Sequence, residues 1–192
     1  MKSIKEQNSH FAKLACTPSL WFHLAHRLRT TANFILPQIN ALWEQIESTQ
    51  NLDQNIEDSK LTDVTSYLSV FMMLSAYAIE NMMKGYLTKI YQNELLKLTT
   101  EGGKIPKMLK THQLIDLADR CHLQLEEHER TLLRRLTSHA VWEGRYPLTE
   151  SASSFFSVIG SDGIPQTDHM WSSTDADQIV HLTNHIAKAL DI

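Results

Sequence analysis

The chain has 192 residues, of which 42% are hydrophobic and 21% charged, a balance typical of a globular protein with a substantial core. Only 6 glycines and 5 prolines are present, which disfavours a turn-rich all-β fold and favours long helices. The net charge of -4 argues against a surface that coats nucleic acid, although a local basic cleft is compatible with it. Two distant cysteines, no signal-peptide core and no apolar run of bilayer length lead us to expect a reduced, cytoplasmic protein.

Helical patterns fill the first part of the chain. Residues 1–16 are polar, and we expect only a short helix there, around Phe11. Thr17-Pro18 predicts a helix start, because a hydroxyl can cap the first turn and proline is tolerated in it. The apolar pattern that follows reaches Ile46 and contains Pro37, at which we expect a kink or a split. Residues 50–63 are polar and acidic and read as a loop.

The strongest helical pattern runs from about Asp63 to Leu96 and is apolar nearly all round over residues 71–78. It therefore predicts a central, deeply buried helix. Glu80 and Lys84 stand one turn apart in the order that favours an ion pair, with a solvated surface pair as the alternative. Four methionines read as core or dimer contacts, and apolar surface so far round one helix predicts a homodimer; they are Met72, Met73, Met82 and Met83.

The second half begins after Gly102-Gly103 with a basic segment, residues 104–110, which is either a solvated loop or a contact for a phosphate backbone. We expect a helix capped by Thr111, another from about Leu125, a long surface loop over 148–173 and a last helix over 174–192. Thr174 and Asp177 resemble a capping box for that last helix. The chain is thus predicted to be a single all-α domain of four to five long helices, with a long loop near the C-terminus.

Residues 132–147 gather arginines, a histidine and aromatic residues. Leu132 and Leu136 mark the buried stripe of a helix, and His139 lies at its border on a helical wheel. Arg135 is one turn before His139 on the same side, and Arg134 is further round. A histidine beside arginines can bind and process a phosphate, since one moves a proton and the other stabilises growing negative charge. A purely structural role is the alternative.

A metal site is the competing chemistry. His181 and His185 are one helical turn apart, with Asp177 one turn before them, and two helical histidines at that spacing can chelate zinc. No further ligand can be assigned from elsewhere in the chain. We therefore expect no metal and no cofactor.

Four motifs resemble the HEPN superfamily, the all-α domains of many prokaryotic ribonucleases and toxins. Arg134, four residues and His139 match its R-x4-6-H motif. Ala78-Ile79-Glu80 followed by Lys84-Gly85-Tyr86-Leu87 is similar to its central helix, and residues 112–117 resemble its H-x-L-x-x-L segment. Residues 144–147 resemble the R-Y-P ending of several branches. The resemblance covers roughly residues 65–147, and it departs from active members at Arg135 and Val141.

The resemblance implies a HEPN-style bundle, a dimer that joins two motif helices, and a metal-independent endoribonuclease in a toxin or phage-defence system. His139 would transfer protons and Arg134 would stabilise the phosphate. The supporting residues would be Arg135, Glu80, Lys84, Arg145 and Tyr146. Because Arg134 fits the motif spacing and Arg135 fits the wheel, which of them is the motif arginine stays open. The alternative is a non-catalytic HEPN module that binds a nucleotide, RNA or a protein partner such as an antitoxin.

Overall fold

The computed structural model describes residues 3–51, 58–143, 158–159, 165–166 and 172–192. These ranges are helical apart from one short antiparallel pair, β1 (Val158–Ile159) and β2 (Pro165–Gln166), which confirms the all-α class. The rest of the predicted 148–173 loop, up to residue 171, lies outside the described residues. No helix in these ranges combines the length and the apolarity that crossing a membrane requires.

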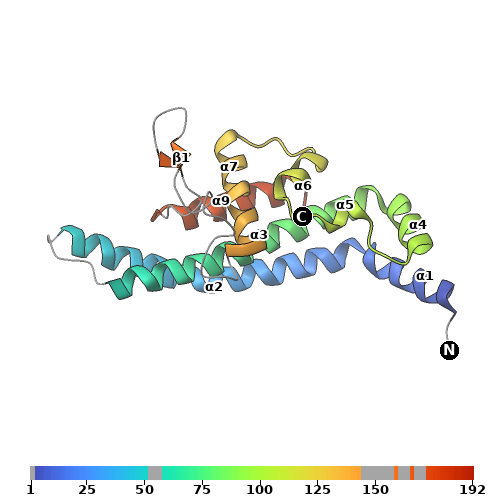
Figure 1. Ribbon diagram of the computed structural model, residues 1–192, viewed down its shortest axis with the longest axis horizontal. Helices are drawn as coiled ribbons and strands as arrows, with labels where there is room; N and C mark the ends of the chain where they lie inside the picture. The colour runs from blue at the N-terminus through green and yellow to red at the C-terminus, as the bar shows by residue number, and fades with distance from the viewer. Residues whose placement is uncertain (1–2, 52–57, 144–157, 160–164, 167–171) are drawn as a thin grey trace.

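Two long helices, α2 (Pro18–Asn51) and α3 (Asp58–Ile90), form the long axis of the structure (Figure 1). They are antiparallel, since Trp21 meets Lys84 at one level while Asn33 and Ser75 share a cavity further along. Of the kink or split predicted at Pro37, the split is wrong, because α2 continues through it, and the kink stays a prediction. Proline has no amide hydrogen to donate to the carbonyl four residues earlier, and the helix tolerates this loss. Beside it, the Gln38 side-chain amide, suitably oriented, donates to the carbonyls of Phe34 and Ile35 at 2.7 and 3.0 Å.

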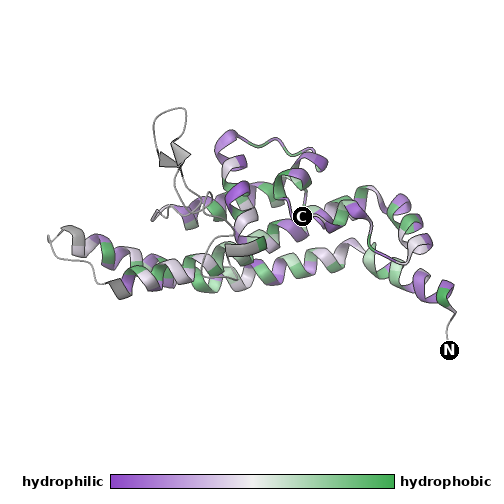
Figure 2. Cartoon of the chain, viewed as in Figure 1, coloured by the Kyte–Doolittle hydropathy of each residue, from purple (hydrophilic) through white to green (hydrophobic). Residues whose placement is uncertain are grey.

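The core lies along α3, which contacts α2, α6, α7, α9 and η1. Nearly every residue from 75 to 88 is buried, which confirms this helix as the central one. Hydrophobic and hydrophilic residues alternate along the ribbons of α2 and α3 (Figure 2), as expected of helices that bury one face. Met72, Met82 and Met83 are buried within the chain and Met73 is half-buried. The methionine surface on which the homodimer prediction rested is therefore covered by the chain's own helices.

One end of the structure is closed by α1 (Ile4–Ala15) and α4 (Gln92–Gly102), which pack against each other (Figure 1). Helix α1 is longer than predicted because Ser3 and Glu6 cap it reciprocally. Helix α3 ends at Ile90, earlier than predicted, and α4 then folds back. Gly103 ends α4 with a left-handed φ of 59°, which glycine adopts without steric cost.

The other elements that pack against α3 are α6 (Leu114–Arg120), α7 (Glu127–Ser138), the π-helical turn η1 (His139–Glu143) and α9 (Asp175–Ala189) (Figure 1). The short helix α5 (Lys107–Lys110) links α4 to α6. The Tyr77 hydroxyl donates to the Ala140 carbonyl at 2.8 Å and ties η1 to α3. The capping box predicted at Thr174 is wrong, since its side chain makes no cap bond. The Asp175 carboxylate instead fixes the segment before the helix, accepting from the Ser172 amide at 3.0 Å.

Candidate functional site

Arg134, the predicted phosphate stabiliser, lies on the outer face of α7. Its side chain is 52% exposed and donates to Glu127 Oε1 at 3.0 Å and to Thr131 Oγ1 at 3.3 Å. Both partners belong to earlier turns of the same helix. The guanidinium therefore runs back along its own helix.

His139, the predicted proton-transfer group, is the first residue of η1 and is only 1% exposed. The sequence placed it at the border of the buried stripe, but the structure places it inside the core. The neighbouring Ala140 is fully buried and held to α3 through Tyr77. The imidazole is thus buried, whereas the Arg134 side chain is half-exposed.

Arg135 ties α7 to the start of α9. Its Nη1 and Nη2 donate to the two carboxylate oxygens of Asp175 at 2.9 and 3.0 Å. The Asp175 side chain is 5% exposed and that of Arg135 is 15% exposed, so the fork-to-fork pair is largely shielded from water. Sequence reasoning missed Asp175. Its only signal was an acidic residue at the start of a helix, where the helix dipole favours negative charge.

Glu80 and Lys84 form the ion pair that their spacing predicts, and the pair is buried rather than solvated. Lys84 Nζ lies 2.6 Å from Glu80 Oε1, and the two side chains are 4% and 7% exposed. The ammonium also lies 6.0 Å from the centre of the Trp21 ring, within range of a cation–π contact. The second carboxylate oxygen, Oε2, is 3.0 Å from His112 Nδ1. Glu80 of α3 therefore contacts both Lys84 of the same helix and His112, which lies just before α6. These residues belong to two of the four motifs.

Two predicted supporting residues, Arg145 and Tyr146, lie outside the described residues, as do Gly144 and Pro147 of the same motif. Glu80 and Lys84 come together as their spacing predicted. Arg135 of α7 instead pairs with Asp175, the first residue of α9. The described part of the chain therefore joins two of the predicted supporting residues, and it places Arg134 at the surface and His139 in the interior.

His185, one residue of the candidate metal face of α9, pairs with α7, while Asp177 and His181 are exposed. His185 Nδ1 lies 2.6 Å from Glu129 Oε1 of α7. Burial alone would raise the pKa of Glu129, but hydrogen bonds from His185 and the Glu126 amide, with positive charge on His185 and His128, hold it below its ordinary value. Within the residues that the structure covers, no three histidine, cysteine, aspartate or glutamate side chains cluster closely enough to bind a metal.

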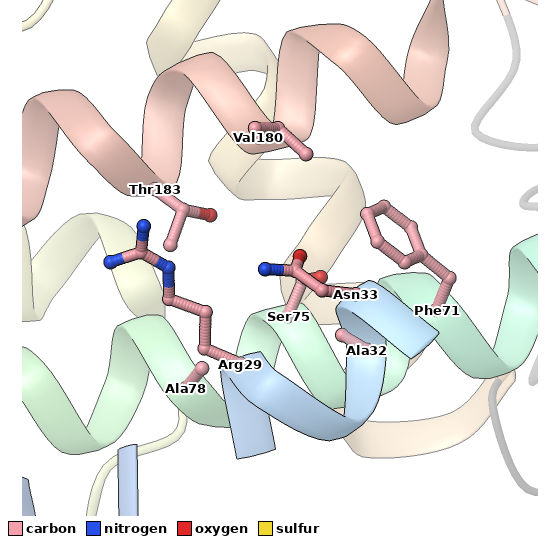
Figure 3. Close-up of a pocket in the computed structure, with 8 residues that line it drawn as sticks. All are labelled: Arg29, Ala32, Asn33, Phe71, Ser75, Ala78, Val180 and Thr183. Atoms are coloured by element: carbon pink, nitrogen blue, oxygen red, sulfur yellow. The ribbon is translucent and has the colours of Figure 1, made fainter. Parts of the chain in front are cut away.

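Two cavities border α2 and α9. The smaller one lies between α2, α3 and α9 and is lined by polar Arg29, Asn33, Ser75 and Thr183 (Figure 3). Its volume of about 10 Å³ is at the lower limit for a single water molecule and too small for a larger ligand. The larger one, of about 220 Å³, has His23 and His26 beside apolar side chains such as Met82. Neither cavity is lined by a residue of the four motifs.

The cluster of Glu80, Lys84 and His112 is consequently the candidate site. It combines a buried, charge-balanced carboxylate with an imidazole whose side chain is 58% exposed. A histidine positioned in this way can accept or donate a proton at its outward nitrogen. No family model, curated protein or solved structure matches the chain, so its likeness to HEPN domains stands on the four short motifs.

Proposed function

We propose that the chain is a HEPN-like helical module that binds RNA and in which Arg134 and His139 do not form a catalytic pair. The observation that carries this is the burial of His139, which is 1% exposed while Arg134 points along the outer face of α7. A proton-transfer group must come within hydrogen-bond distance of the reacting hydroxyl. A ring enclosed in the core is instead a structural element, like Arg135 in its pair with Asp175.

RNA is the proposed partner because a basic strip stands out on an otherwise acidic chain. Lys104, Lys107 and Lys110 are all exposed, on α5 and the segment before it. The net charge of the whole chain is -4, so this strip is a local feature. Lysines that neutralise phosphates release counterions, which gives affinity without reading sequence.

Fluorescence anisotropy with a labelled single-stranded RNA tests this proposal. The variant Lys104→Gln/Lys107→Gln/Lys110→Gln should bind several-fold more weakly than the unaltered protein at low salt. The slope of log affinity against log salt should fall by about 2, at about 0.7 per phosphate contact on a single strand. Lys5→Gln/Lys13→Gln on α1, two exposed lysines outside the strip, is the control and should bind RNA nearly as the unaltered protein does. An unaltered protein that does not bind RNA at low salt would refute the proposal.

A second candidate is the metal-independent HEPN endoribonuclease of a toxin or phage-defence system, acting as a homodimer. The observation in its favour is the π-helical turn that begins at His139, one turn after Arg135, since such turns are frequent at functional sites. This candidate requires a rearrangement that exposes His139. It predicts cleavage that resists EDTA, leaves 2′,3′-cyclic phosphate ends and is abolished by a folded His139→Gln variant. A dimeric mass by light scattering is its second requirement.

A further inference from the structure

His112 has one ring nitrogen next to a buried carboxylate, while much of its side chain is exposed to solvent. Its side chain is 58% exposed, whereas that of Glu80 is 7% exposed. Nδ1 lies 3.0 Å from Glu80 Oε2, and the other oxygen of the same carboxylate lies 2.6 Å from Lys84 Nζ. One oxygen of the Glu80 carboxylate thus pairs with the Lys84 ammonium, and the other pairs with the His112 imidazole.

This arrangement fixes which ring nitrogen faces outward. An ionised carboxylate can only accept hydrogen bonds, so Nδ1 is the nitrogen that carries hydrogen and donates to Glu80. Nε2 is then the nitrogen left with a lone pair when the ring is neutral. A buried carboxylate that orients an exposed imidazole in one tautomer is the device by which enzymes prepare a histidine base.

We infer that His112 is the proton-transfer group of an RNA-cleaving site, with Glu80 as the positioning residue; the inference rests on the RNA binding proposed above. Nε2 takes the proton from a ribose 2′-hydroxyl while the 2′-oxygen forms a bond to phosphorus. The bond from phosphorus to the 5′-oxygen breaks, and that oxygen takes the proton back from Nε2. The products are a 2′,3′-cyclic phosphate and a 5′-hydroxyl, and no metal or redox partner is consumed.

The surroundings of His112 suit a phosphodiester. Lys110 stands two residues before it, at the end of α5, and Lys107 one turn earlier; both side chains are exposed. Their ammonium groups can approach the negative charge that develops on phosphorus. Lys84 neutralises Glu80 inside the core, so the buried carboxylate does not leave an uncompensated negative charge beneath the substrate.

The competing explanation is that His112 only anchors the start of α6 to α3. Glutamine separates the two, because its amide can still donate to Glu80 but cannot carry a proton near neutral pH. The chain also supplies a matched control in His128, whose Nδ1 lies 3.3 Å from Glu126 Oε2 but whose side chain and partner are 72% and 80% exposed. His128→Gln thus removes an imidazole–carboxylate pair that no core holds in place.

The experiment follows cleavage of end-labelled RNA in EDTA, with RNA affinity and melting temperature measured on the same samples. His112→Gln should keep its affinity and melting temperature and lose at least about 100-fold in rate, the lower range for general acid–base catalysis. The rising limb of the pH–rate profile should disappear with it. His128→Gln should cleave like the unaltered protein. Glu80→Gln/Lys84→Met, which leaves no buried charge unpaired, should keep RNA affinity and lose about tenfold or more in rate.

Each failure has its own signature. Full cleavage by a folded His112→Gln protein overturns the inference. RNA binding without cleavage by the unaltered protein also overturns it and leaves the proposed binding function standing. Cleavage that is lost in His139→Gln and kept in His112→Gln overturns it in favour of the HEPN pair. Absence of RNA binding removes the proposed function itself.

Discussion

The guanidinium of Arg135 grips the carboxylate of Asp175 through two hydrogen bonds, of 2.9 and 3.0 Å, and joins α7 to the first turn of α9. Its neighbour Arg134 makes one ion pair, with Glu127, on the solvent side of the same helix. Adjacent arginines therefore have different environments. Arg135, which is largely shielded from water, fixes the packing of α7 against α9, and the exposed Arg134 does not.

Replacing these arginines one at a time should separate their roles. Arg135→Ala leaves Asp175 buried without its partner guanidinium, so we expect a loss of about 3 kcal/mol in the free energy of unfolding. Arg134→Ala breaks a pair whose side chains are 52% and 76% exposed, and should cost less than about 1 kcal/mol. Urea unfolding followed by circular dichroism measures both. Equal losses for the two variants would contradict the assignment.

The buried Glu80–Lys84 pair should show strong energetic coupling. Glu80→Gln or Lys84→Met alone leaves one charge in the core, and each should cost about 3 kcal/mol. The double variant removes both charges and should cost clearly less than the sum, with a coupling energy of about 2 kcal/mol. The cycle through the exposed pair Glu127 and Arg134 is the comparison, with an expected coupling below about 0.5 kcal/mol. Additive single effects at Glu80 and Lys84 would show that the two charges do not depend on each other.

Cys121 should make stability fall at alkaline pH. Burial raises the pKa of its thiol from 9.0 to about 12, so the folded state resists forming a thiolate that the unfolded chain forms freely. The neutral thiol contributes its full share of the free energy of unfolding below pH 9, and this share is lost between about pH 9 and 12. The loss amounts to about 1 kcal/mol at pH 10. Cys121→Ala should have a flatter dependence on pH than the unaltered protein in urea unfolding. Parallel curves for the two proteins would exclude this linkage.

Gly85 should not tolerate alanine. A Cβ atom there would lie 2.4 Å from Phe22 Cε1 and 2.6 Å from Cδ1, so the ring must move. We expect overpacking of about 1–3 kcal/mol to exceed the gain of about 1 kcal/mol that alanine brings to a helix. Gly102→Ala is the control, since nothing lies within 4 Å of its Cβ position. It should be neutral or stabilising, and a more stable Gly85→Ala protein would show that Phe22 yields at little cost.

The helices could be predicted well from the sequence because the spacing of apolar residues along a helix depends on that helix alone. The central position of α3 and the pairing of Glu80 with Lys84 both follow from such local patterns. The break after Ile90 was missed because the apolar pattern continues into α4, which folds back onto α1. Continuity through Pro37 was missed because α2 packs along α3 on both sides of the proline, and no local pattern reports that packing.

The candidate site was harder to predict because it depends on contacts between distant segments. Asp175 meets Arg135, and His112 meets Glu80, across separations that no local pattern reports. A helical wheel places His139 at the edge of a stripe, but it cannot show that η1 packs against α3 and buries that edge. The helical wheel therefore misjudged whether the His139 side chain faces solvent.

The free energy of unfolding of His139→Ala, measured beside the RNA affinity of the same preparation, tests the central claim most directly. If His139 is a core residue, its removal leaves a cavity and unsatisfied polar surroundings, and should cost at least about 1–3 kcal/mol. The folded variant should bind RNA as tightly as the unaltered protein. A His139→Ala protein of unchanged stability that has lost RNA cleavage would contradict the account and restore Arg134 and His139 as a catalytic pair.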